Sequence, residues 1–399
     1  MLIFQGLPFG RELSASEMLT ASDAHDIAYD RSTSFGFSTT IIPLLFWLST
    51  YILSVVQVLR TDYEKFMICM RKSFALSLYL VLMLLDLMFS SAKSIVFINI
   101  IHYVGCIFLC FSASQFCYDN VQDILKSLTK TFFIIVFINV GFYLLYPEYG
   151  VSYDGRVKGI TGNPNSLGML SSLAAWTALV SFLWESRFRN RSFYFLFFLF
   201  ASALLYLTES MTSVVSMACA TIVLFWISFG AIKPKINLLR AVFLSAIPIL
   251  LLVAGYLSEM MRIVGSQVGR TGDFSGRASH WIDALRLISM KPVIGWGFDN
   301  NASAIRESGL STSHFHDGYL DVAVRSGLVG VVLLFIFLVR FSSPFRIYNK
   351  KVVVLICSFF AYMYFYNITE VTYFSNRNEM WLIALFLYFY RERFVLRSL

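Results

Sequence analysis

Long apolar segments that alternate with short basic connections constrain this chain more than any other feature. A helix needs about 17–25 mostly apolar residues to cross the hydrocarbon core of a bilayer. The 399 residues are 57% hydrophobic and only 14% charged, which a water-soluble fold of this length has too little interior to hide. The sequence therefore predicts an all-α polytopic transmembrane bundle of about eleven helices. The candidate spans are residues 38–59, 74–91, 94–117, 130–147, 165–184, 192–208, 211–229, 240–257, 318–339, 352–368 and 379–390.

The positions of Lys and Arg predict how these spans are oriented. Basic residues follow the first, third, fifth, seventh, ninth and eleventh spans, as Arg60, Arg187, Arg340 and Arg391 illustrate. Basic connections stay on the cytoplasmic side of a membrane. We therefore expect an external N-terminus and a cytoplasmic C-terminus. This topology also explains the net charge of +8, so that no nucleic-acid partner is expected.

The predicted topology divides the chain into four parts. Residues 1–37 are an N-terminal external arm, and residues 38–257 hold the first eight transmembrane helices. Residues 258–317 form one large external, periplasmic loop, and residues 318–399 hold the last three helices with a cytoplasmic tail. An alternative is that the given start lies downstream of a lost first helix. Function concentrates in long loops on a rigid scaffold, so the large loop is the first place to look for a site.

The large external loop is rich in cationic and imidazole side chains. Three of the five histidines lie in it, together with five arginines: His280, His314, His316, Arg262, Arg270, Arg277, Arg286 and Arg306. External loops are usually poor in Arg. The planar guanidinium makes paired charge-assisted hydrogen bonds, which suit a diphosphate. The loop therefore predicts an anion pocket at the membrane surface, and a solvated loop with local ion pairs is the alternative.

His316 and Asp317 stand at the predicted start of the ninth transmembrane helix. Asp317 is expected to cap this helix. The positive end of the helix disfavours an imidazolium and keeps His316 neutral. A neutral imidazole accepts a proton near ambient pH, so His316 is a candidate general base. The alternative is that His316 is a surface or capping residue.

The same helix holds two further spacings. Asp321 and Arg325 stand four residues apart, which predicts an ion pair on one helix face. Gly327 and Gly330 predict a small-residue face for close packing of a second helix. In the second span, Asp86 is costly in lipid and is expected to face the bundle interior, without an assigned role.

The segment GITGNPNSLG, residues 159–168, predicts a helix start. Asn163 is a favoured capping residue, and Pro164 suits the first helical position. Gly168 is expected to allow close packing. No Cys-x-x-Cys or Cys/His ligand spacing and no glycine-rich nucleotide loop is found in the sequence, so neither a metal nor another cofactor is expected.

These elements together resemble the O-antigen ligase/polymerase superfamily. His316-Asp317, then nine residues, Gly327, two residues and Gly330 is similar to its His-polar-x9-Gly-x2-Gly signature. The GITGNPNSLG segment is similar to a Gly-Asn-Pro-Asn element of O-antigen ligases. The HDGYLD segment, residues 316–321, looks most like the corresponding segment of exopolysaccharide polymerases. Residues upstream of the signature are similar to the family pattern of Gly-Arg pairs, Trp and Pro-x-x-Gly-x-Gly-Phe: Arg270, Arg277, Trp281, Pro292, Gly295, Gly297 and Phe298.

The resemblance implies a metal-independent glycosyltransferase of the bacterial inner membrane. It implies that a glycan on undecaprenyl diphosphate is transferred, with inversion, to a second lipid-linked repeat. Arg270 and Arg277 would then bind the diphosphate, and His316 would take the proton of the acceptor hydroxyl. The expected supporting residues are Asp317, His314, Asn163, Asn165 and Arg325. Chain-length regulators and export proteins are further candidate partners.

Several alternatives stay open at this point. A ligase that moves the glycan to lipid A–core would share the same active-site residues. A non-enzymatic lipid or polysaccharide transporter would more often show internal repeats or interrupted helices. His314 is an alternative base to His316. Asp317 and Met211 depart from the family pattern, because Asn is usual at the first position and Arg or Lys is common near the second.

Overall fold

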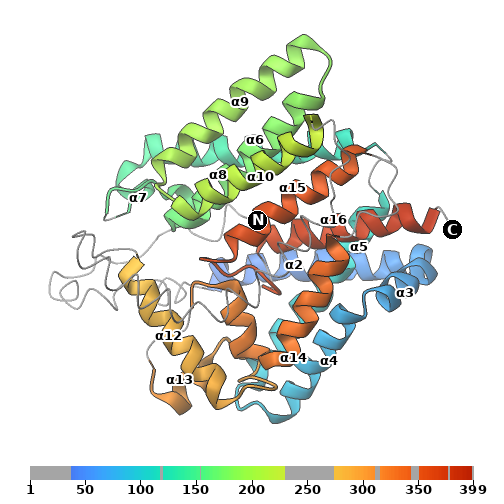
Figure 1. Cartoon of the computed structure of the whole chain (residues 1–399), viewed down its shortest axis with the longest axis vertical. Helices are drawn as coiled ribbons and strands as arrows, with labels where there is room; N and C mark the ends of the chain where they lie inside the picture. Colours follow the sequence, from blue (N-terminus) through green and yellow to red (C-terminus); the bar gives the residue numbers. More distant parts are fainter. Residues whose placement is uncertain are drawn as a thin grey trace. The chain divides into compact units, whose positions relative to one another are not determined.

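A computed structural model of the chain describes residues 37–116, 120–152, 154–229, 274–310, 315–342, 350–375 and 378–397, and within this part it is built of helices with no strand (Figure 1). Seven of the described helices are long and apolar enough to cross a membrane. Ten of the eleven predicted spans coincide with described helices. The remaining one, residues 240–257, lies outside the described residues, as does the predicted arm up to residue 36. The prediction of an all-α polytopic bundle is confirmed, and the protein is a multi-pass membrane protein.

The described helices fall into two compact units, each made of segments that are distant in the sequence. The first unit takes in residues up to 52 and residues 118–217, and the second takes in residues 53–117 and 218–399. Helices α2, Phe37–Gln57, and α10, Met211–Phe229, are divided between the units.

Helix α8 is the centre of the first unit. Its neighbours there are α6, Val121–Leu145, and α9, Phe188–Leu207 (Figure 1). Helix α8, Pro164–Trp184, is apolar around its whole circumference and buried along most of its length, as expected for a helix surrounded by protein. The short helices α7, Pro147–Gly150, and η3, Gly159–Thr161, lie in the connection between α6 and α8.

The start of α8 has the structure that its sequence predicts. The side chain of Asn163 accepts a hydrogen bond from the backbone N–H of Asn165, and Pro164 occupies the first helical position. A Cβ on Gly168 would lie 2.5 Å from the Cβ of Ser210, so the predicted close packing is also confirmed.

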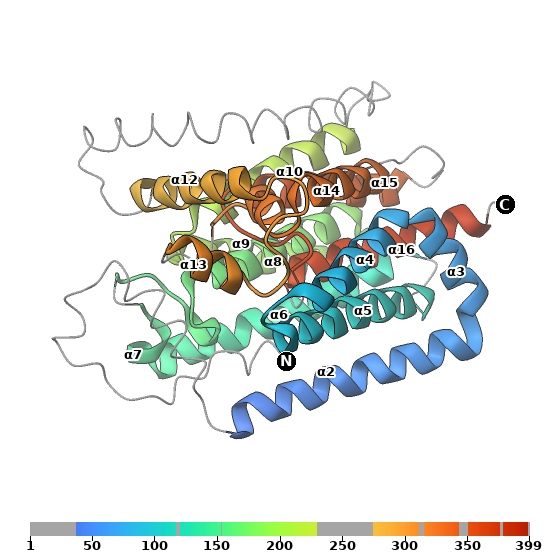
Figure 2. The same cartoon turned by 90° about the horizontal axis from the view of Figure 1, so that it is seen from below.

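The second unit is built around long helices that pack side by side. Helix α5, Lys93–Phe116, lies against α4, Phe74–Phe89, and α16, Glu379–Arg397 (Figure 2). Helix α14, Gly318–Phe341, packs on α4 and on α12, Phe274–Met290. The remaining elements of this unit are η2, Val58–Asp62, α3, Tyr63–Lys72, α13, Ala302–Ser308, and α15, Lys350–Tyr366.

Basic residues gather at one end of the second unit. Arg391 donates a hydrogen bond to the carbonyl oxygen of Arg340, near the end of α14, and the Arg340 guanidinium lies over the ring of Phe74 at the start of α4. Arg393 donates to the carbonyl of Ser114, near the end of α5. The residues that follow the ninth and eleventh predicted spans therefore meet at the same ends of these helices. The described part of the large loop, which includes His280 and His316, lies toward the opposite ends.

Candidate functional site

The start of α14 fixes the backbone around His316 and Asp317. Asp317 accepts hydrogen bonds from the backbone N–H groups of Tyr319 and Leu320, both at 2.8 Å, so the predicted cap is confirmed. His316 has a φ of 48°, in the left-handed region that residues other than glycine seldom adopt. Strained backbone of this kind persists where the surrounding structure holds it, and it is concentrated at functional sites.

A second loop is tied directly to this helix start. The backbone N–H of Gly318 donates to the carbonyl of Asn367 at 2.8 Å. A Cβ on Gly318 would collide with the Asn367 side chain, so glycine is required for this approach. The buried Asn367 side chain in turn accepts from the backbone N–H groups of Thr372 and Tyr373, which shapes the turn between α15 and α16.

This turn brings an acidic side chain to His316. The Nδ1 atom of His316 lies 4.0 Å from a carboxylate oxygen of Glu370. The two side chains are 28% and 13% exposed, so the pair is open to solvent only on one side. Helix α12 adds a second imidazole, because the rings of His280 and His316 lie 5.6 Å apart, centre to centre. The structure thus assembles two histidines and a glutamate from three separate segments.

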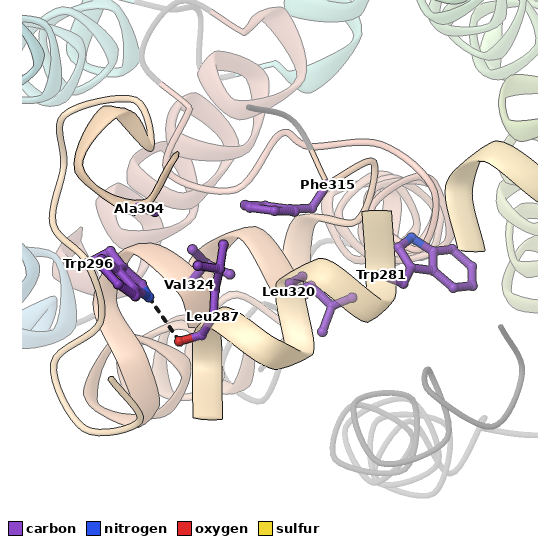
Figure 3. Packing of buried hydrophobic residues seen from close by; sticks show 8 residues of the cluster. Trp281, Leu287, Trp296, Ala304, Phe315, Leu320 and Val324 are labelled. Atoms are coloured by element: carbon purple, nitrogen blue, oxygen red, sulfur yellow. Dashed lines mark hydrogen bonds between the residues drawn. The ribbon is translucent and has the colours of Figure 1, made fainter. Parts of the chain in front are cut away.

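Helix α12 is held against α14 by a buried apolar cluster (Figure 3). The indole N–H of Trp296 donates to the carbonyl of Leu287 at 2.9 Å, which ties the segment after α12 back to the helix. The cluster comprises Trp281, Ala284, Leu287, Trp296, Ala304, Phe315, Leu320 and Val324. Because Trp281 and Phe315 are direct neighbours of His280 and His316 in the sequence, this packing fixes both histidines.

Helix α14 is broken at Gly327, and the segment after α12 fills the break. Gly327 has φ 60° and ψ −159°, which only glycine adopts at low cost. The break frees carbonyl groups before it and N–H groups after it. The backbone of the Pro292–Gly297 segment pairs with these groups through four hydrogen bonds: Trp296 to Val324, Gly297 to Arg325, Leu328 to Pro292 and Val329 to Val293. The Pro-x-x-Gly-x-Gly segment therefore joins α12 to α14 through these four backbone hydrogen bonds, here termed the backbone splice.

The interpretation of Gly327 and Gly330 as a helix-packing face is wrong. A Cβ on Gly327 would collide with the Val293 carbonyl, which belongs to the loop segment and not to another helix. The space beside Gly330 is filled by Ser326, one turn earlier in α14 itself. The spacing resembled a packing motif because helix breaks and helix contacts both require small residues.

Asp86 anchors the same segment from α4. Its carboxylate accepts a hydrogen bond from the backbone N–H of Phe298 at 2.7 Å, while Asn99 of α5 donates to the Phe298 carbonyl at 2.8 Å. Gly297 packs directly on the Asp86 carboxylate, where a Cβ would lie 2.5 Å from it. This contact supplies the role that the sequence left unassigned to Asp86, which is to hold the backbone splice.

Asp321 and Arg325 form the predicted ion pair. The Nε atom of Arg325 lies 2.9 Å from one carboxylate oxygen of Asp321, and Nη2 lies 3.2 Å from the other. Such a two-point contact is the strongest geometry available to this pair. The ion pair lies one turn after the Asp317 cap, so the two charges neutralise each other within the helix whose start carries His316.

The other predicted site residues are only partly described. Arg277 lies in α12, one turn before His280, but its side chain is outside the described set. Arg270 and His314 lie outside the described residues. Asn163 and Asn165 belong to the first unit, where Arg156 donates to the Asn165 side chain at 2.8 Å and to the Thr208 carbonyl at 2.9 Å. Their predicted association with His316 stays a prediction.

Comparison with known families covers the segment that carries this geometry. Residues 195–335 match the family model described as O-antigen ligase, and the match includes α12, the backbone splice and the first part of α14. This match supports the resemblance to the O-antigen ligase/polymerase superfamily. A search among curated proteins found no matching sequence. The function is thus of the O-antigen ligase/polymerase type, and His280 and His316 lie inside the matched domain.

Two residues of this candidate site were not selected from the sequence. His280 was counted among the loop histidines, yet its place on the face of α12 toward α14 depends on the packing of Trp281. Glu370 lies outside the matched domain, about fifty residues after His316, in the connection between the last two predicted spans. The usable signal was its position in an external connection, the same predicted side as His316.

Burial raises the pKa of Asp317 from its ordinary value of 3.8 to about 7, against two backbone hydrogen bonds that lower it. The folded state therefore holds this proton more tightly than the unfolded state. Stability from the protonated form is present below about pH 4 and is lost as the pH rises toward 7. We expect Asp317→Asn, which keeps the cap, to match the wild type below about pH 4 and to exceed its stability by about 4 kcal/mol at pH 8.

The measurement is thermal unfolding of both purified proteins in detergent across this pH range. Glu307→Gln on α13 is the control, because Glu307 is half exposed and pairs only with the Lys291 side chain at the surface. A constant difference between Asp317→Asn and wild type at every pH would show that the carboxyl does not titrate in this window.

Proposed function

We propose that this protein is a polysaccharide repeat-unit polymerase of the bacterial inner membrane, acting at the periplasmic face. The donor is a glycan on undecaprenyl diphosphate, and the acceptor is the terminal sugar of a second lipid-linked repeat. The observation that carries the proposal is the assembly of His316, Glu370 and His280 at the ends of helices opposite to the basic residues Arg340 and Arg391.

His316 acts as the general base in this mechanism. Its imidazole takes the proton from the acceptor hydroxyl as the hydroxyl oxygen attacks the anomeric carbon. The bond between that carbon and the diphosphate oxygen breaks, and the diphosphate leaves with the electron pair. Displacement in one step inverts the anomeric centre. The proton then passes from His316 to water, which restores the neutral base.

Arg270 and Arg277 bind the departing diphosphate. Charge develops on the bridging oxygen as the glycosidic bond breaks, and guanidinium groups stabilise it more in the transition state than in the ground state. The position of Arg277 in α12, one turn before His280, supports this role, because the buried apolar cluster packs α12 against the first part of α14. The proposed reaction uses no metal.

The HDGYLD segment supports a polymerase over a ligase, because it is most similar to exopolysaccharide polymerases. The deciding experiment is complementation of a deletion strain, with glycan length and attachment profiled on gels. If the deletion strain carries single repeats on lipid A–core but no long chains, the protein is a polymerase. Unattached, lipid-linked polymer with nothing on lipid A–core is the ligase outcome. Unchanged glycan of normal length and attachment would contradict both.

Arg277→Ala is expected to lower polymer yield about 100-fold, because it removes charge-assisted contacts to the leaving group. Arg277→Lys keeps the positive charge but loses the planar guanidinium. We expect its polymer yield to lie between those of the wild type and Arg277→Ala. Arg306→Ala is the matched control, since Arg306 lies in the same loop on α13 and donates to Ser91 instead. Polymer yields from Arg277→Ala equal to those from Arg306→Ala, at equal membrane levels, would refute the diphosphate role.

A further inference from the structure

The Asn367–Tyr373 turn is built to hold Glu370 at one fixed place. Asn367 is completely buried, and its side chain bonds to the Met363 carbonyl on one side and to Thr372 and Tyr373 on the other. The backbone N–H of Glu370 donates to the Tyr366 carbonyl, which continues the end of α15 into the turn. The glutamate therefore sits on a rigid turn and not on a free loop.

The same turn is bonded to Gly318, the first residue of α14 after the Asp317 cap. The hydrogen bond from Gly318 to the Asn367 carbonyl joins the two segments, and no side chain fits between them. The hydroxyl of Tyr319 also lies within hydrogen-bond distance of the Tyr373 hydroxyl, at 3.0 Å. Two ties within four residues of His316 fix its distance from Glu370.

We propose that Glu370 is the positioning residue for His316, a role that rests on the proposed function. A carboxylate oxygen of Glu370 lies 4.0 Å from Nδ1 of His316, beyond hydrogen-bond distance. Its charge favours the tautomer with the proton on Nδ1 and leaves Nε2 to accept the proton of the acceptor hydroxyl. The same carboxylate stabilises the imidazolium that forms once that proton has been taken. The left-handed backbone at residue 316 turns the ring toward the turn between α15 and α16.

Other charged and titratable groups near His316 set the background for this pair. Asp317 is next to it in the sequence and caps α14, and the ring of His280 approaches from α12. The carboxylate of Asp321, one turn further along α14, is paired with Arg325. Glu370 is the described carboxylate within ion-pair distance of the His316 ring.

Glu370→Gln provides the test, because it keeps the size and polarity of the side chain but removes the charge. We expect kcat/KM to fall about 10- to 100-fold. We also expect the acid limb of the pH profile to move to lower pH, by about one unit, since a carboxylate beside an imidazole raises the imidazole pKa. A purely structural role for Glu370 would lower the yield of folded protein without moving this limb.

The assay uses lipid-linked repeats extracted from the deletion strain as substrate for purified protein in detergent. Glu307→Gln is the matched control and is expected to keep the wild-type profile. Repeating the comparison in Asp317→Asn shows whether the limb belongs to the histidine–glutamate pair or to Asp317. A Glu370→Gln profile identical to that of the wild type would overturn the positioning role.

His316→Ala distinguishes this inference from the proposed function itself. Loss of activity in His316→Ala together with a normal profile in Glu370→Gln refutes only the positioning role. Full activity in His316→Ala refutes the general base and the positioning role together.

Discussion

His316→Ala is expected to abolish polymer formation, with a fall in rate of about 100- to 10,000-fold, the range that general-base catalysis contributes. The acceptor hydroxyl is then left without a group to take its proton, while the start of α14 keeps its Asp317 cap. Alanine also adopts a left-handed φ less readily than histidine, so folded yield has to be followed alongside activity. The measurement is glycan length in the complemented deletion strain, normalised to the amount of protein in the membrane.

His280→Ala is the comparison variant for this experiment. His280 lies on α12, 5.6 Å from the His316 ring, and it is the described imidazole best placed to be the base in its stead. We expect His280→Ala to retain more activity than His316→Ala. If instead His280→Ala lost the polymer and His316→Ala kept it, the general base would be His280. The assignment of His316 from the family signature would then be wrong.

Gly327→Ala is expected to destabilise the fold by about 3 kcal/mol or more. Two independent costs add at this position. The backbone conformation, with φ 60° and ψ −159°, is accessible essentially to glycine alone. A methyl group would also collide with the Val293 carbonyl and break the backbone splice between α12 and α14. The measurement is the fraction of protein that remains monodisperse in detergent after heating.

Two other glycines separate these costs. Gly309→Ala carries a positive φ of 70° but has open space around it, so it tests the backbone cost alone and is expected to lose about 1 kcal/mol. Gly330→Ala would collide with both side-chain atoms of Ser326 and tests crowding without a positive φ. A Gly327→Ala protein as stable as both controls would show that α14 closes into a regular helix and that the splice is dispensable.

The backbone splice explains why a helix break lies so close to the proposed base. Nine residues lie between the Asp317 cap and the break at Gly327, and both ends of this short helical piece are bonded to other segments. Asn367 holds one end through Gly318, and the Pro292–Gly297 segment holds the other. Asp86 and Asn99 then fix that segment to α4 and α5. The result is a rigid platform that holds His280 and His316 at a set distance, as a preorganised site requires.

Local features of the sequence determined most of the architecture. Apolar length located ten described helices, because the thickness of a bilayer imposes one span length on every segment. The caps at Asn163 and Asp317 and the pair of Asp321 and Arg325 were also predictable, since each depends on residues within four positions of one another. The family signature, which spans residues 316–330, likewise located His316, which lies within the matched domain.

Tertiary structure alone decided which distant residues complete the site. Glu370 reaches His316 across 54 positions, and Asp86 reaches Phe298 across 212. Gly327 was misread because a break and a packing face require the same small residue, and only the docked Pro292–Gly297 backbone distinguishes them. Periodicity, charge and capping act within one helix, so they can be predicted from the sequence. Pairings between segments depend on how the helices pack, and no local pattern encodes that.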